Sequence, residues 1–326
     1  MKTRLTILVV AVALLSLLAW SGGALLWARL NTTGSGFDTP SDVAVSTQGN
    51  IYVVDSGHSR IVEMSPAGKK LAVWNTNPKH YGDNDQPSGI WVDRYGNVYT
   101  SAQGCHPGPF LSGSCSTVHA RQEVFSPRGR LLPQAASLPV LASDPYGNIY
   151  TCSSRRFSKL PVRRLPAAAC SSSTPFLNGS SWIVDARGRL LEANGGNPCP
   201  CVSSLSTTGT CPAADQSCDP HDPWRTIDVG NTFNGQVFDR LAVDRSGDIY
   251  AVETPSANVP TGGAADRVAK IAPNGTVQAV WTGFANATGA AVGSDGSVYV
   301  TDRDQNQVVK LSASGKKLAA WSGPIG

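Results

Sequence analysis

Short apolar runs alternate with polar turns along almost the whole chain. In the clearest stretch this pattern predicts four β-strands, at residues 42–45, 51–55, 60–64 and 69–74. The second run is rich in β-branched and aromatic residues, and the third alternates polar with apolar positions as a half-buried strand does. Glycine, proline and small polar residues fill the short gaps between the runs. The stretch therefore predicts a four-stranded antiparallel sheet.

The same pattern recurs along the chain. Glycine, a polar residue, an aliphatic residue and usually tyrosine follow an apolar run six times, beginning at Gly49, Gly96, Gly147, Gly188, Gly247 and Gly296. A period of roughly 40–60 residues indicates a repeat architecture. A lone sheet cannot bury its apolar faces, but six sheets arranged radially can. We therefore predict an all-β fold, a six-bladed β-propeller of four-stranded antiparallel blades, with blades at residues 37–84, 85–134, 135–177, 178–235, 236–283 and 284–326.

The repeats are not equally regular. Blades 1, 2, 5 and 6 follow the whole pattern, whereas blades 3 and 4 keep its first half and lose the second. Blade 6 has a fourth strand of its own, so we expect the ring to close by packing blade 6 against blade 1 without strand exchange. Trp74, Trp281 and Trp321 end the outer strands of three blades, and we interpret them as packing residues.

An apolar run from Leu5 to Trp27 precedes the repeats and follows Lys2 and Arg4. About 20 apolar residues span a bilayer, and basic residues at the start keep that end in the cytoplasm. Residues 1–29 are therefore predicted to be one transmembrane signal-anchor helix, and residues 30–36 a flexible tether. The alternative is a signal peptide cleaved near Gly22-Gly23-Ala24. The expected location is the cell membrane, single-pass with the propeller on the extracytoplasmic side, or secreted if the segment is cleaved.

Eight cysteines agree with export, because an even count in an exported chain indicates disulfide bonds. Cys105–Cys115 and Cys152–Cys170 are the simplest pairs, and the other four are expected to pair within one insertion: Cys199, Cys201, Cys211 and Cys218. The connectivity stays open. These last four residues, with His221, also form an alternative zinc-binding set.

Charge limits the classes of partner. The net charge is +4 and charged residues make up only 15% of the chain. A nucleic-acid footprint would be a strongly basic stripe, so no nucleic-acid partner is expected. We expect a monomer, attached to the membrane by its N-terminal helix, whose further partner is a protein, a peptide or a cell-surface polymer.

These repeats resemble the NHL-repeat family. The family pattern is a proline-led inner strand, Gly-Asn-Ile/Val-Tyr-Val, an aspartate, a polar turn and Arg-Ile, and in blade 1 it runs from Pro40 to Arg60-Ile61. The resemblance covers about residues 37–321 and implies the propeller fold. It implies less about activity, because the family includes lyases, sensor domains, and protein- and RNA-binding platforms.

The exported amidating-lyase relatives in this family place histidines around a zinc ion in the axial channel. The matching positions here are Ser59 and Asn306, and His58 is one residue away, so the resemblance does not carry the metal set over. No Gly-x-Ser-x-Gly elbow is present either. The recurring Asp93, Asp144, Asp185 and Asp244 are interpreted as turn caps. We predict no catalytic residue and no cofactor, although calcium or zinc in the axial channel is left open.

Two sets of residues are candidate binding surfaces. The first lies before the inner strands and should converge at the mouth of the central channel: Ser41, Asp42, Ser88, Ser181, Asp239, Arg240 and Thr288. Its alternative is an ordinary wet tunnel. The second is a cationic edge of blade 3 for an anionic partner: Arg155, Arg156, Lys159, Arg163 and Arg164. Its alternative is a solvated strand edge.

These features favour a non-catalytic propeller that acts as a ligand-binding, partner-binding or sensor module. The alternative is an extracellular lyase or hydrolase of the amidating-lyase or lactonase type that uses the channel mouth.

Overall fold

The computed structural model describes residues 36–76, 86–107, 115–132, 140–152, 160, 162–165, 182–194, 201–206, 225–227, 236–255 and 266–323. Phe37–Gly326 forms one compact unit. Within the described part of the chain, no helix is both long enough and apolar enough to cross a membrane. The predicted anchor, residues 1–29, and nearly all of the predicted tether lie outside it.

The first sheet consists of four consecutive antiparallel strands: β1 (Pro40–Val45), β2 (Ile51–Asp55), β3 (Arg60–Met64) and β4 (Lys70–Asn75). All residues of β2 and β3 are buried, because these two strands lie between β1 and β4 and both of their faces are covered. Gly49 takes a positive φ of 92° in the turn between β1 and β2. The four strands predicted for this repeat are confirmed to within two residues at each end.

Two further sheets repeat this arrangement completely. Their strands are β15 (Gln236–Val243), β16 (Ile249–Pro255), β17 (Arg267–Ile271) and β18 (Val277–Trp281), then β19 (Ala287–Val292), β20 (Val298–Asp302), β21 (Gln307–Leu311) and β22 (Lys317–Trp321). The second sheet of the chain has three antiparallel strands, β5 (Gln86–Val92), β6 (Val98–Pro107) and β7 (Cys115–Phe125). Where a fourth strand was expected, one bridge joins Phe125 to Leu131.

The two irregular repeats behave differently from each other. The fourth repeat forms a complete antiparallel sheet of β11 (Trp182–Val184), β12 (Arg189–Asn194), β13 (Cys201–Ser206) and β14 (Arg225–Ile227). The third repeat forms β8 (Val140–Ser143), β9 (Ile149–Thr151) and β10 (Val162–Arg164), and β10 pairs with β9 in parallel.

The prediction of six equivalent blades of four antiparallel strands is therefore wrong. Among the described strands, five sheets are wholly antiparallel blades, and the β8–β10 sheet does not repeat their pattern. The segment between β9 and β10 contains no glycine for a tight hairpin, and Pro161 cannot donate a ladder hydrogen bond.

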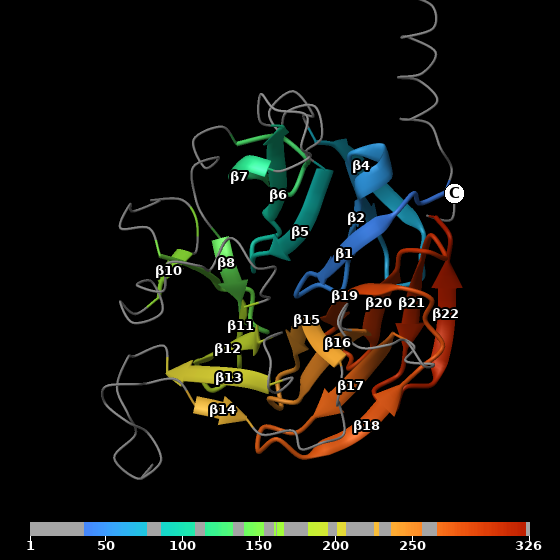
Figure 1. Cartoon of the computed structure of the whole chain (residues 1–326). Coiled ribbons are helices and arrows are strands. Elements are labelled where there is room, and N and C mark those ends of the chain that lie inside the picture. Colours follow the sequence, from blue (N-terminus) through green and yellow to red (C-terminus); the bar gives the residue numbers. More distant parts are fainter. Residues whose placement is uncertain are drawn as a thin grey trace, which may run out of the picture. The chain divides into compact units, whose positions relative to one another are not determined.

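The first strands of the sheets surround a common axis (Figure 1). β1 contacts β5, β5 contacts β8, β8 contacts β11, β11 contacts β15, β15 contacts β19, and β19 contacts β1. The cycle is closed, and the later strands of each sheet lie progressively further from the axis. This arrangement is a β-propeller. β5 and β15 occupy opposite places in the cycle.

The predicted packing role of the outer-strand tryptophans is confirmed. Trp74, Trp281 and Trp321 are 8%, 8% and 7% exposed. Each indole ring lies on a turn glycine of the next blade: Trp321 on Gly68, Trp74 on Gly129 and Trp281 on Gly315. We call this contact the Trp–Gly latch. Buried clusters fill the space between the same pairs of blades.

Among the described strands, the last and first sheets each consist of consecutive strands, while residues 28–35, on which the predicted absence of strand exchange depends, lie outside the described residues. Phe37 N–H donates to Ser322 O over 2.7 Å, and Thr39 N–H donates to Asn306 Oδ1 over 2.7 Å. The Phe37 ring is buried among residues of both sheets, including Trp321. The propeller chain therefore begins and ends at the same seam.

Candidate functional site

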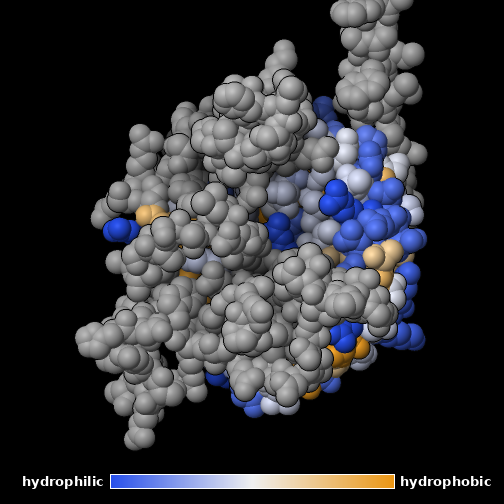
Figure 2. Space-filling view, viewed as in Figure 1, coloured by the Kyte–Doolittle hydropathy of each residue, from blue (hydrophilic) through white to orange (hydrophobic). Residues whose placement is uncertain are grey.

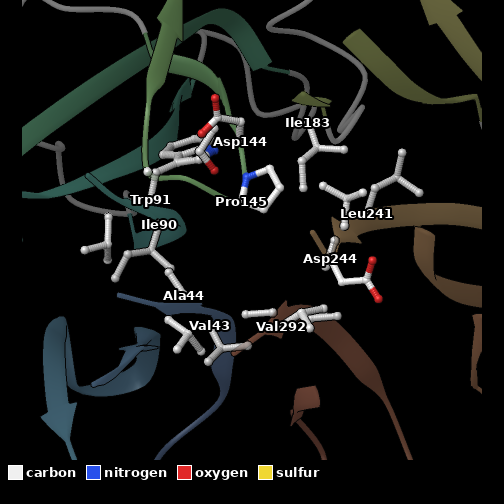
Figure 3. A pocket seen from close by; sticks show the side chains of 18 of the residues that line it. Val43, Ala44, Ile90, Trp91, Asp144, Pro145, Ile183, Leu241, Asp244 and Val292 are labelled. Atoms are coloured by element: carbon white, nitrogen blue, oxygen red, sulfur yellow. The ribbon is translucent and has the colours of Figure 1, made fainter. Parts of the chain in front are cut away.

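A cavity of about 140 Å³ lies on the propeller axis and is lined by residues from all six sheets. Figure 3 shows apolar side chains from opposite sides of the ring around one space, among them Val43, Ile90, Ile183, Leu241 and Val292. The inner strands run in one direction along this axis, so their first and last residues mark its two ends. One end carries a charged pair, and the other end carries turn carboxylates.

The charged pair is Asp42 and Arg240, the two mouth residues that bring charge into the cavity lining. Asp42 is 7% exposed, and its carboxylate accepts backbone N–H groups from Val43 at 2.9 Å and Ile90 at 3.1 Å. Burial raises the pKa of Asp42, and the nearby positive charge of Arg240 opposes that effect. Because Ile90 belongs to β5, Asp42 links the first blade to the second.

The other described mouth residues also make links between blades. Ser41 Oγ donates to Pro87 O at 3.3 Å, and Ser56 Oγ lies 2.7 Å from Ser41 Oγ. Thr288 Oγ1 donates to Pro40 O at 3.1 Å, across the seam between the last and first sheets. These hydroxyl groups therefore stabilise the ring and have little hydrogen-bonding capacity left for a ligand.

Arg240 is different because its side chain crosses the mouth. Arg240 Nη2 donates to Ser88 O at 3.1 Å, which joins β15 to β5 on the opposite side of the ring. The residue after Ser88 is Gly89, where a Cβ atom would meet Ser101 Oγ and the Trp91 ring. This bond uses one of the five N–H donors of an arginine. Arg240 is partly exposed, so its remaining donors can meet a ligand.

The structure tests only part of the predicted mouth and cationic edge. Ser181 lies outside the described residues, and of Asp239 only its place in β15 is described. In the cationic edge, Arg155, Arg156 and Lys159 lie outside the described residues, while Arg163 and Arg164 are exposed on β10. Arg163 Nη1 donates to Tyr150 OH at 3.4 Å. An anionic partner for this edge stays a prediction.

The recurring aspartates are turn caps, as predicted. Asp93 Oδ1 accepts the N–H groups of Tyr95 and Asn97, both at 2.8 Å, and Asp93 Oδ2 accepts Tyr99 OH at 3.0 Å. Asp144, Asp185 and Asp244 make the same backbone contacts in their own blades. Burial, with the Asp144 charge, raises the pKa of Tyr150 to about 12. These carboxylates fix turns and tyrosines, so their hydrogen-bonding capacity is largely used.

The structure describes only some of the cysteines that are predicted to form disulfide bonds. Cys152 is disulfide-bonded. Cys105 and Cys115 lie on the neighbouring strands β6 and β7, and Cys201 lies on β13. Cys170, Cys199, Cys211 and Cys218 lie outside the described residues, as does His221. The pairing stays a prediction.

No group of three or more histidine, cysteine, aspartate or glutamate side chains that could hold a metal is found in the described part of the chain. His58 Nδ1 instead lies 2.9 Å from Asp55 Oδ2, within the first blade. Sequence reasoning named Arg240 but missed its contact across the channel. The available signal was a long cation at a mouth position where most of the other repeats have a small residue.

Comparison with known proteins finds one repeat family and several solved structures of low identity. The NHL repeat model matches residues 37–63, and no curated protein matches the chain. Among solved structures, a streptogramin B lyase is 10% identical over 91% of this chain and 87% of its own, with a TM-score of 0.46. A catalytically inactive virginiamycin B lyase from Staphylococcus aureus, solved with quinupristin, is 11% identical over 89% and 85%, with a TM-score of 0.45. A gluconolactonase from Xanthomonas campestris is 14% identical over 90% and 78%, with a TM-score of 0.36.

At this level of identity, these structures assign no activity to the chain. The matched repeat coincides with β1, β2 and most of β3, and the strands that follow repeat the same unit around the axis. The chain is a β-propeller in which residues 37–63 match the NHL repeat.

Proposed function

We propose that this propeller is a non-catalytic binding module that takes a small organic monoanion at the mouth of its axial cavity. One observation carries the proposal: Arg240 spans the mouth, is partly exposed and donates only one described hydrogen bond, to Ser88 O. A guanidinium presents a planar fork that matches a carboxylate, and such charge-assisted pairs are the strong ones.

The size and charge of the mouth narrow the ligand class. A cavity of about 140 Å³ is smaller than the roughly 300–1,000 Å³ pockets that hold drug-sized ligands. Asp42 places a carboxylate near Arg240, so a second negative charge on the ligand would be repelled. A small monocarboxylate fits these limits better than a phosphate dianion.

The proposed cellular location of this module comes from the sequence. We propose that residues 1–29 anchor the chain in the membrane, that the propeller faces the extracytoplasmic side, and that the cysteines form disulfide bonds there. We also propose that the β8–β10 sheet is a degenerate blade, because β8 contacts both β5 and β11 and so occupies one of six places in the ring.

Replacing the mouth cation tests the proposed function. The full chain is titrated by calorimetry with acetate, pyruvate, lactate and benzoate, and we expect at least one of them to bind. Arg240→Met should weaken that binding by about 10- to 100-fold, because a hydrogen bond to a charged group contributes about 1.5–3 kcal/mol. Arg245→Met is the matched control, since Arg245 is an exposed arginine that lines the cavity from its other end.

Equal losses in the two variants would mean that the effect reflects net charge alone, which would contradict a site at Arg240. Binding of no monocarboxylate would also contradict the proposal. Metal analysis of the same preparation tests the open question of axial calcium or zinc.

A hydrolase or lyase is the second candidate, and one observation favours it. Asp42 has a raised pKa and lies beside a cation in the cavity lining, a combination that is enriched at catalytic sites. Its carboxylate would act as a general base, with Arg240 stabilising negative charge on the substrate. Turnover of simple lactones or of peptidyl-hydroxyglycine substrates that is lost in Asp42→Asn would replace the binding proposal with this one.

A further inference from the structure

A row of exposed cations lies on three consecutive blades around the seam where the propeller chain begins. The row consists of residues in the third turn and outer strand of these blades: Lys69, Lys70, Arg128, Arg130, Lys316 and Lys317. All six side chains are exposed, and none of them has an ion-pair partner in the described part of the chain. We call these six residues, together with Leu71 and Leu318, the basic rim.

The same turn geometry places one cation in each of the three blades. Ser65 Oγ accepts Lys69 N–H at 3.2 Å, Ser126 Oγ accepts Arg130 N–H at 3.1 Å, and Ser312 Oγ accepts Lys316 N–H at 3.1 Å. The serine and the positive-φ glycine of each turn thus fix where the outer strand begins. The cations recur at one structural position.

The Trp–Gly latch joins each of two rim turns to the end of the outer strand of the preceding blade. Trp321 lies on Gly68, next to Lys69, and Trp74 lies on Gly129, next to Arg130. The corresponding turn of the fifth repeat, which ends in Thr276 and is fixed by Asn274, carries no cation. Among the described turns of this kind, cations therefore occur in three consecutive blades and not in the fifth.

Two large apolar side chains accompany the cations. Leu71 is 48% exposed and Leu318 is 52% exposed, each directly after a pair of lysines. Figure 2 shows that the surface over β1–β4 and β20–β22 is mostly hydrophilic, with small hydrophobic spots among the polar residues. Leucines among exposed cations are typical of surfaces that lie on anionic membranes.

The start of the propeller chain lies among the three blades of the basic rim. Phe37 N–H bonds to Ser322 O, one residue after Trp321, whose indole ring contacts Gly68 of the rim turn. The predicted tether, residues 30–36, spans at most about 25 Å when extended. If residues 1–29 cross the membrane, the basic rim is kept close to the bilayer surface.

We propose that the basic rim docks the propeller on the anionic surface of the membrane to which the chain is attached. The lysines and arginines meet lipid phosphates, and the two leucines enter the headgroup region. This docking rests on the proposed membrane attachment but is independent of the ligand at Arg240, so each can fail without the other.

The test uses the full chain reconstituted into vesicles of phosphatidylcholine alone or mixed with phosphatidylglycerol. A photoreactive lipid headgroup labels docked surfaces, and mass spectrometry locates the labels. We expect labels on peptides from the three rim turns in the anionic vesicles, and much weaker labelling in phosphatidylcholine or at high salt, where surface charges are screened. If the fifth-blade turn were labelled as strongly as the three rim turns, the proposal would be wrong.

Matched charge variants separate the rim from net charge. The triple variant Lys69→Ser, Arg130→Ser, Lys316→Ser should lower the ratio of docked to undocked propeller by about a hundredfold, because each cation near an anionic surface contributes about 1 kcal/mol. The control removes three exposed arginines elsewhere, Arg94→Ser, Arg245→Ser, Arg303→Ser, and should keep the labelling. Equal loss in both variants, or binding to polyglutamate but not to vesicles, would refute membrane docking.

Discussion

Gly68→Ala should destabilise the propeller by about 3 kcal/mol, far more than an ordinary surface glycine substitution. Gly68 has a φ of +83°, and a Cβ atom built on it would overlap the buried indole ring of Trp321. A left-handed backbone costs an alanine about 1–2 kcal/mol, and overpacking a buried contact adds about 1–3 kcal/mol. The free energy of unfolding is measured by urea denaturation followed by circular dichroism, with the disulfide bonds intact.

Gly283 provides the matched control, because its φ is +100° and a Cβ atom there would meet nothing within 4 Å. Gly283→Ala should therefore cost only the backbone strain, about 1–2 kcal/mol. Trp321→Ala should cost about 3–5 kcal/mol by leaving a cavity at the seam.

A double-mutant cycle isolates the contact itself. In the Trp321→Ala background, Gly68→Ala should cost no more than Gly283→Ala, because the indole ring is no longer present. If Gly68→Ala and Gly283→Ala cost the same in the wild-type background, the Trp–Gly latch contributes nothing to stability.

The sequence predicted the tryptophan of the Trp–Gly latch but not the glycine that it contacts. Trp74, Trp281 and Trp321 recur at one place in the repeat, and that recurrence predicts packing. The glycine that each tryptophan contacts belongs to the next blade, at a sequence separation that no local pattern connects. Strands within a repeat follow from alternation and turn chemistry, whereas contacts between blades depend on how whole sheets pack.

The irregular repeats show the same limit. The third and fourth repeats both lose the second half of the sequence pattern, yet β13 and β14 complete the fourth sheet. The residues of β13, Cys201–Ser206, are mostly small and polar, so their strand propensity is weak and pairing with β12 decides their structure. The parallel β9–β10 pair likewise has no signature in the sequence beyond the missing hairpin turn.

At the channel mouth, the sequence identified the polar residues but not their hydrogen-bond partners. We expected the polar groups of Ser41, Asp42 and Thr288 to bind a ligand. In the structure, each of them makes a hydrogen bond to a neighbouring blade. Small polar residues near an axis are needed for closure as much as for binding, so composition cannot separate the two roles. The role of Arg240 could be distinguished from that of the other mouth residues only once β5 and β15 were known to lie opposite each other.

The acidic residue that ends the second strand of a blade leads to the other large prediction. Asp55 in the first blade accepts Asp38 N–H at 2.7 Å and lies 2.6 Å from Arg60 Nε. Asp302 in the last blade accepts Asn286 N–H at 3.0 Å. In the fifth blade this position is Glu253, which is fully buried and pairs with Arg267 Nη2 at 2.9 Å through Oε2. Its other oxygen, Oε1, has no hydrogen-bond partner among the described residues.

The stability of the propeller should therefore fall as the pH rises from about 4.5 to about 7. Burial raises the pKa of Glu253 from 4.5 to about 7, although the Arg267 charge opposes the shift. The folded state then holds the Glu253 proton more tightly than the unfolded chain does. This favourable contribution is complete below the unfolded pKa and is lost as the pH passes the folded one, a change on the order of 3 kcal/mol.

Two substitutions test the assignment to this residue. Glu253→Gln cannot ionise, so the difference in unfolding free energy between variant and wild type should grow in favour of the variant by about 2–3 kcal/mol between pH 5 and pH 8. Arg267→Met removes the opposing charge, so it should move the loss of stability to a higher pH range. Urea denaturation at a series of pH values measures both. A Glu253→Gln propeller with the same pH dependence as the wild type would show that this carboxyl keeps its ordinary pKa in the folded state, and that the unpartnered oxygen is hydrated in solution.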